Sequence, residues 1–167
     1  ADIDHPRRID WPRLLPFLGL HLGCFTVVWV GTSVTAVLVA VVLYALRMFA
    51  ITGFYHRYFS HGAFCTSRAF QLVFAVLGAT GVQRGPLWWA SQHRHHHAHA
   101  DLPEDSHSPQ QHGFWWSHVG WFMARENFPT RTERVLNLAR FPELRFLDRY
   151  DALVPALLLI ALYLAGI

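Results

Sequence analysis

Two long apolar runs occupy the first third of the chain. No Asp, Glu, Lys or Arg occurs anywhere in residues 14–46. One continuous helix over this stretch would be about 50 Å long, well beyond the roughly 30 Å hydrocarbon core of a bilayer. The Gly-Thr-Ser segment at 31–33 interrupts the apolar pattern. We therefore predict two membrane-spanning helices, at about 14–30 and about 34–55, that form a transmembrane hairpin.

The remaining apolar stretches are shorter. Residues 69–82 are too few to cross a bilayer and are bracketed by Arg68 and Arg84, which favours an interfacial or re-entrant helix. Residues 83–151 mix charges, prolines and aromatic rings, and we expect them to form a helical cytosolic cap. Residues 152–167 begin a third span but are too few to complete it. The pattern as a whole predicts an all-α integral membrane protein.

Arginines give the expected orientation of the helices. The polar tail at 1–13 carries three of them, and residues 56–151 carry ten. Because positive charge concentrates on the cytosolic side of a membrane, we predict that both segments are cytosolic. The sequence starts without Met and stops inside the third apolar stretch. We therefore expect a piece of a longer protein, in which 14–167 form part of one membrane domain.

Composition agrees with a membrane protein and limits the kinds of chemistry. The chain is 53% hydrophobic and 15% charged, against about 25% charged residues in a typical globular protein. No nucleic-acid-binding motif accompanies the net charge of +3, so nucleic acid is not an expected partner. Cys24 and Cys65 stand in apolar settings and are predicted to be buried thiols. His21, within the first apolar run, is predicted to be a hydrogen-bonded core residue.

Five histidines crowd into seven residues at 93–99. His93 and His97 are four apart and share one face of a helix, and His96 lies about 100° around from His97. His95 points nearly opposite His93 and is the least suitable ligand. Imidazole is a common ligand of transition metals, so this helix can offer His93 and His97 to one metal and His96 to a second.

A second histidine pair, His56 and His61, lies upstream. A spacing of five residues is poor for one face of a continuous α-helix, so we predict that the helix ends near His56 and that the chain turns before His61, with Gly62 as the stop. A loosely metal-binding, low-complexity loop is the competing interpretation. Tryptophans flank the downstream cluster, however, which favours a structured metal site over such a loop.

Several segments together resemble a known family. They are His-Arg-Tyr-Phe-Ser-His at 56–61, His-Arg-His-His-His at 93–97, Asp-Ser-His-Ser at 105–108, Ser-His-Val-Gly-Trp at 117–121 and Phe-Pro-Glu-Leu at 141–144. They resemble the histidine boxes and downstream signatures of the membrane-bound acyl-CoA desaturases, the stearoyl-CoA desaturase-like branch in its bacterial form. The resemblance runs from about residue 14 to the end of the chain.

The resemblance implies four transmembrane helices under a cytosolic cap, with two iron ions held by histidines and no catalytic residue beyond the metal ligands. It assigns His56, His61, His93 and His97 to one iron and His96 to the other. Possible supporting groups behind the ligands are Asp105, His107 and His118. The positions expected to line the acyl tunnel are Trp89 and Gln83, with Tyr44 and Met48 setting its depth.

The chain departs from the family in one respect. No third His-x-x-His-His box follows His97, so half of the second iron's ligands are missing and truncation is the expected explanation. The resemblance implies O2-dependent desaturation of a fatty acyl chain, of the acyl-CoA delta-9 type, in lipid metabolism. Expected partners are the acyl substrate, membrane lipid and a redox protein that donates electrons. The expected location is a bacterial inner membrane, and the polypeptide alone is expected to be inactive.

Three alternatives remain open at this point, one of which is a natural short form without activity that serves as an interaction subunit. A membrane alkane or lipid hydroxylase of the histidine-box superfamily would use similar metals but form an alcohol instead of an alkene. A non-catalytic, histidine-rich metal-binding or transport protein would need polar residues inside its spans, and residues 34–46 contain almost none.

Overall fold

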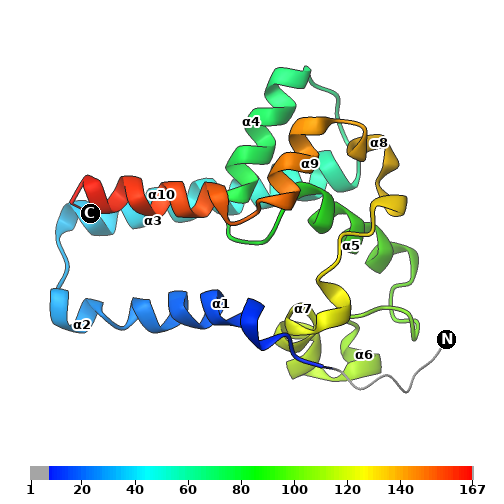
Figure 1. Cartoon of the computed structure of the whole chain (residues 1–167), viewed down its shortest axis with the longest axis horizontal. Coiled ribbons are helices and arrows are strands. Elements are labelled where there is room, and N and C mark those ends of the chain that lie inside the picture. Colours follow the sequence, from blue (N-terminus) through cyan, green and yellow to red (C-terminus); the bar gives the residue numbers. More distant parts are fainter. Residues whose placement is uncertain (1–7, 167) are drawn as a thin grey trace. The chain divides into compact units, whose positions relative to one another are not determined.

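The structure, a computed structural model, describes residues 8–166 (Figure 1). Most of the predicted tail, residues 1–7, lies outside this range. Between residues 8 and 166 the chain forms helices and turns and no strand, apart from one isolated antiparallel bridge between Ile9 and Ala124. The predicted all-α class is confirmed. The chain divides into two compact units, Ala1–Thr32 with His95–Thr130 and Ser33–Arg94 with Arg131–Ile167, each described by itself.

The first apolar run forms helices α1, Trp11–Cys24, and α2, Val27–Val30. Together they make a 20-residue segment long and apolar enough to cross a membrane. Gly31, with a φ of +78°, ends this segment. Two predictions are wrong here, because α1 presents most of its side chains outward: His21 and Cys24 are both exposed. His21 is still satisfied, since its Nδ1 donates to the carbonyl of Phe17 at 2.8 Å.

The second apolar run forms α3, Val34–Phe49, which continues directly into η1, Ala50–Ser60. This 27-residue segment also has the length and hydropathy of a membrane span. The Ser33 hydroxyl accepts a hydrogen bond from the Ala36 amide at 3.0 Å and caps the start of α3. Two candidate spans in an all-helical chain agree with the predicted membrane protein.

The helix does not end near His56, as the sequence had suggested. Residues 50–60 form a π-helix, in which hydrogen bonds join residues five apart. The His61 amide accordingly donates to the His56 carbonyl at 3.2 Å. The chain leaves the helix at Gly62, whose φ is +60°. The loop that follows carries Cys65, an exposed thiol rather than the predicted buried one.

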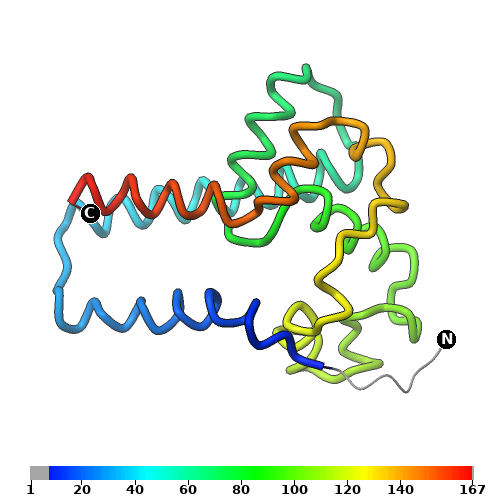
Figure 2. Tube along the Cα trace, viewed as in Figure 1, coloured from blue at the N-terminus to red at the C-terminus, as the bar shows by residue number. Residues whose placement is uncertain are grey.

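The core of the second unit surrounds this π-helix. Helix α4, Arg68–Ala79, packs on η1, and helix α9, Pro142–Arg149, packs on α4. Figure 2 follows the chain from η1 through α4. The core comprises mainly the following buried side chains: Tyr55, Phe59, Ala75, Leu87, Ala90, Val135 and Leu144. Burying one large apolar side chain stabilises a fold by roughly 1.5–3 kcal/mol, so this cluster holds η1 firmly in place.

Helix α4 ends at Ala79 rather than near residue 82, and its outer face carries exposed apolar side chains, Phe70, Val73 and Leu77. Helix α5, Pro86–Ala98, carries the downstream histidine cluster. The remaining elements are α6 Pro109–His112, η2 Trp116–Gly120, α7 Trp121–Met123, η3 Arg125–Asn127, η4 Thr132–Arg134, α8 Leu136–Ala139 and α10 Leu153–Leu164.

Arg68 and Glu143 join α4 to α9 through two parallel hydrogen bonds, of 2.6 and 2.8 Å. Arg68 lowers the pKa of Glu143 to about 2. Because the folded-state pKa lies below the ordinary value of 4.5, this pair stabilises the fold fully above pH 4.5. The stabilisation is lost as the pH falls from there toward about 2.

We expect Glu143→Gln to lower the midpoint of thermal unfolding at pH 7 and to make progressively less difference below pH 4.5. Unfolding midpoints of both proteins across this pH range test the expectation. The exposed Glu126 gives a matched control, and Glu126→Gln should leave the midpoint nearly unchanged. A deficit of Glu143→Gln that stays constant down to pH 3 would contradict the assignment.

Candidate metal centre

Three imidazoles converge in the second unit. The Nε2 atom of His61 lies 3.0 Å from Nε2 of His56 and 3.0 Å from Nε2 of His93. Each pair of rings meets nearly at right angles, with centroids 4.6–5.0 Å apart. Such nitrogens can all point at one another only if protons are shared between them or if a cation lies among them. Converging imidazole nitrogens are the usual arrangement around a transition metal.

The π-helix explains how His56 and His61 come together. In an α-helix they would lie about 140° apart around the axis. With hydrogen bonds between residues five apart, the same two residues lie one turn apart on one face. Single π turns inside α-helices are frequent at functional sites. The backbone of η1 is thus shaped to bring this histidine pair together.

Arg94 fixes α5 against the end of η1. Its Nε donates to the Ser60 carbonyl at 3.0 Å, and its Nη2 donates to the Phe59 carbonyl at 2.8 Å. Its Nη1 also reaches the Arg134 carbonyl and the Asn137 side chain. A cation that satisfies the last carbonyls of a helix is favourable for both groups. Sequence reasoning missed this role; the signal was an arginine directly after His93, inside the histidine cluster.

Trp89 lies beside the three histidines. Its ring stacks on His93 with centroids 4.8 Å apart, and its Nε1 donates to Oε1 of Gln83 at 3.1 Å. These two predicted tunnel residues therefore contact each other, and Trp89 covers one side of the cluster. Tyr44 and Met48 are exposed on α3, so their place in a tunnel stays a prediction.

The histidines at the end of α5 fall in the first unit. His97 follows His93 by one helical turn and shares its face of the helix. His95 is turned elsewhere, since its Nε2 donates to the Glu104 carbonyl at 3.0 Å. His96 forms a second group with Asp105 and His107, in which one possible ligand atom from each residue lies within 4.8 Å of the others.

Asp105 is fully buried and is the centre of this second group. Its Oδ2 accepts from His96 Nδ1 at 2.9 Å and from the Asp101 amide at 3.2 Å, and its Oδ1 accepts from the His107 amide at 3.2 Å. Burial would raise the pKa of Asp105, but these hydrogen bonds outweigh it and lower that pKa. The carboxylate thus stays charged and fixes the orientation of the His96 ring.

His107 and His118 differ in their surroundings. The ring of His107 stacks between His96, at 4.2 Å, and Trp121, at 4.6 Å. Its burial, together with the nearby His96, lowers the pKa of His107, and its Nδ1 lies 3.5 Å from Oδ1 of Asp105. His118 is exposed, stacks on Phe114 and belongs to neither histidine group.

The chain matches known proteins over most of its length. Residues 32–167 match the family model of the fatty acid desaturases. An sn-1 stearoyl-lipid 9-desaturase from Anabaena variabilis is 36% identical over 166 residues, covering 95% of this chain and 60% of that protein. An sn-2 palmitoyl-lipid 9-desaturase from Nostoc sp. (strain 36) is 39% identical over 117 residues, or 67% of this chain and 41% of that protein.

An acyl-CoA 5-desaturase from Anemone leveillei is 32% identical over 163 residues, which cover 87% of this chain and 49% of that protein. The chain spans 41–60% of the length of these three relatives. The matched residues include both histidine clusters, the π-helix and residues 83–151. On these grounds the chain belongs to the fatty acid desaturase family.

Proposed function

We propose that this chain supplies the first two histidine clusters of a di-iron centre that uses O2 to desaturate a fatty acyl chain. The observation that carries the proposal is the convergence of His56, His61 and His93 at 3.0 Å on a π-helical backbone. Family membership supports the acyl substrate, because the curated relatives are named as acyl-lipid and acyl-CoA desaturases.

The proposed ligands of one iron are His56, His61 and His93, with His97 following on the same face of α5. His96 is the proposed ligand of the other. Imidazole nitrogens suit iron, so the donor set fits this metal. When bound, the two irons would supply the oxidising power, drawn from O2, that removes hydrogen from an unactivated methylene. Residues of the chain orient this centre: Arg94 holds the helices together, Asp105 turns His96, and Trp89 shields His93 from water.

For the substrate, we propose that Trp89 and Gln83 line the acyl channel and that Tyr44 and Met48 limit its depth. The acyl carrier is either a lipid or CoA, as among the relatives. A redox protein on the cytosolic side would deliver electrons. Of the residues given, the proposal assigns only His96 to the second iron, since no His-x-x-His-His segment follows His97 up to residue 167.

A chimera tests the proposal. Residues 1–167 would replace the equivalent region of the Anabaena variabilis relative, and the product would be assayed with stearoyl-lipid and with stearoyl-CoA. We expect two irons per chimera and an alkene product from one of these substrates. An alcohol product would favour the hydroxylase alternative. A folded chimera that binds no iron would overturn the proposal.

The second proposed iron site gives a separate prediction about Asp105. Asp105→Asn replaces one acceptor oxygen by an NH2 group, which cannot accept from His96 or from the backbone amides. We expect metal affinity in the chimera to fall by roughly 10–100-fold, the usual cost of losing the group that orients a metal ligand. Titration with Fe(II) measures the effect. Glu104→Gln, an exposed neighbour, is the control, and an equal loss in both variants would count against the positioning role.

The proposed orientation places the two histidine clusters on the cytosolic side of a bacterial inner membrane. Cys65 offers a direct test, because it is exposed in the loop between η1 and α4. With Cys24 changed to Ser, we expect a membrane-impermeant maleimide to label Cys65 only after spheroplasts are permeabilised. Labelling of intact spheroplasts would reverse the orientation.

A further inference from the structure

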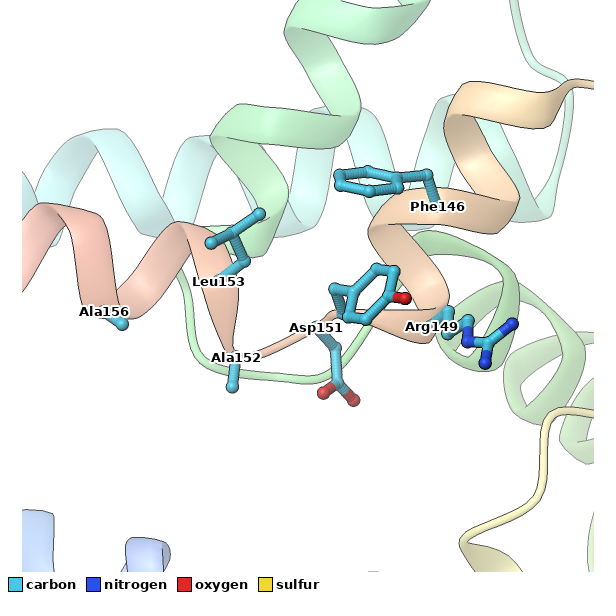
Figure 3. A pocket seen from close by; sticks show the side chains of 7 residues that line it. Phe146, Arg149, Asp151, Ala152, Leu153 and Ala156 are labelled. Atoms are coloured by element: carbon cyan, nitrogen blue, oxygen red, sulfur yellow. The ribbon is translucent and has the colours of Figure 1, made fainter.

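The junction of α9 and α10 contains an open hollow of about 580 Å³. It is lined by Phe146, Arg149, Tyr150, Asp151, Ala152, Leu153 and Ala156 (Figure 3). The hollow is a shallow depression that is open to its surroundings. The hollow lies far along the sequence from both histidine clusters and contains none of their residues.

One part of the hollow is apolar and faces outward. Phe146 and Tyr150 lie one turn apart, with ring centroids 5.0 Å apart, and both rings are about half exposed. The exposed Leu153 and Leu157 continue this surface along α10, a helix without charged residues. Exposed aromatic rings next to an apolar helix are typical of the boundary between the hydrocarbon core and the headgroups of a membrane.

Three partly exposed acidic side chains lie in or near the hollow, and each has a hydrogen-bond partner on another element. Glu143 binds Arg68, and Asp151 binds Arg84 at 2.5 Å. The carboxylate of Asp148 accepts from the Trp88 amide at 2.7 Å. Arg68 and Arg84 balance the charges of Glu143 and Asp151, whereas the Trp88 amide is neutral and leaves the charge of Asp148 in place.

The basic side chains face outward. Arg145 and Arg149 are four residues apart on α9 and both are exposed. The guanidinium of Arg149 lies 5.6 Å from the centre of the Tyr150 ring and makes no ion pair within the described residues. The hollow therefore combines apolar side chains with two exposed arginines at its edge.

We propose that this hollow binds an anionic phospholipid of the surrounding bilayer. The phosphodiester would lie against Arg149 and Arg145, and the upper part of an acyl chain would lie on Phe146, Tyr150 and Leu153. Basic residues next to a membrane attract anionic headgroups, whereas a zwitterionic lipid offers no net charge to attract. The site is independent of the histidine clusters, so it does not rest on the proposed desaturation.

The test uses the purified chain in a neutral detergent. Phosphatidylglycerol and phosphatidylcholine with identical acyl chains are titrated separately, and bound lipid is counted by native mass spectrometry. We expect tighter binding of phosphatidylglycerol and a higher midpoint of thermal unfolding in its presence. Arg149→Gln and Arg145→Gln should each weaken phosphatidylglycerol binding roughly five-fold.

Matched variants separate the possible causes. Arg131→Gln removes the same charge from an exposed position elsewhere and should bind phosphatidylglycerol as the unmodified chain does. Arg149→Lys keeps the charge and should retain the lipid preference, which guards against a mere folding defect. Phe146→Ala should weaken the binding of both lipids.

Three results would overturn the proposal. The first is equal affinity for the two lipids, which would leave only an apolar contact. The second is protection by inorganic phosphate equal to that by phosphatidylglycerol, which would leave only an anion site. The third is a double variant, Arg145→Gln with Arg149→Gln, that binds phosphatidylglycerol as well as Arg131→Gln does.

Discussion

Replacing His93 by Ala is expected to abolish desaturation by the chimera and to remove iron from the cluster that His93 shares with His56 and His61. The Nε2 atom of His93 lies 3.0 Å from that of His61, so the substitution removes one of the three converging nitrogens. Removing a ligand should lower iron affinity by more than the roughly 10–100-fold that follows the removal of a group supporting a ligand. Iron per protein and alkene product are the two measurements. His96→Ala and His97→Ala should likewise abolish the product.

His95 provides the matched control on the same helix. Its ring donates a hydrogen bond to the Glu104 carbonyl. His95→Ala therefore removes the same side chain as His93→Ala does but leaves the proposed ligands in place. We expect this variant to keep its iron and much of its activity. If His95→Ala lost iron as completely as His93→Ala, the assignment of helix faces would be wrong, and the division of ligands between two irons with it.

The apolar pattern was sufficient to predict the class of fold but not the backbone that forms the site. The long apolar run, with Arg47 as its one charged residue, identifies a helix over residues 34–55 whatever its internal hydrogen bonding. The five-residue spacing of His56 and His61 was read as the end of that helix, because an α-helix places such residues on different faces. The structure instead changes the hydrogen-bond spacing and keeps the helix. The same spacing was thus the available sign of a π-helix.

The supporting residues of the site were predictable only in part. Asp105 was expected behind the ligands because the Asp-Ser-His-Ser segment resembles a family signature, and the structure places it against His96. Arg94 was not expected, because three of its four partners are backbone carbonyls, at Phe59, Ser60 and Arg134. Carbonyl acceptors leave no trace in the residue types. Contacts of this kind become visible only when the fold brings distant segments together.

Gly78→Ala is expected to destabilise the second unit. A Cβ at this position of α4 would lie 2.0 Å from Cε1 and 2.2 Å from Cδ1 of Tyr55. The Tyr55 ring is fully buried, and its hydroxyl donates to the Ala75 carbonyl at 3.3 Å, so it cannot swing away freely. Overpacking of this kind typically costs about 1–3 kcal/mol, which outweighs the gain of up to about 1 kcal/mol when Ala replaces Gly in a helix.

The same substitution elsewhere in the chain separates packing from helix propensity. A Cβ on Gly19, in α1, would meet nothing within 4 Å, so Gly19→Ala should leave stability unchanged or raise it slightly. Gly78→Ala should lower the unfolding midpoint and also lower iron content, because Tyr55 immediately precedes His56 and any shift of its ring displaces the π-helix. The double variant Gly78→Ala with Tyr55→Leu should lose less stability than the sum of the two single variants. The reason is that Tyr55→Leu removes the ring that the new Cβ at position 78 would strike. Two results would contradict this packing of α4 on η1. One is strict additivity of the stability losses of Gly78→Ala and Tyr55→Leu, and the other is a Gly78→Ala protein as stable as Gly19→Ala.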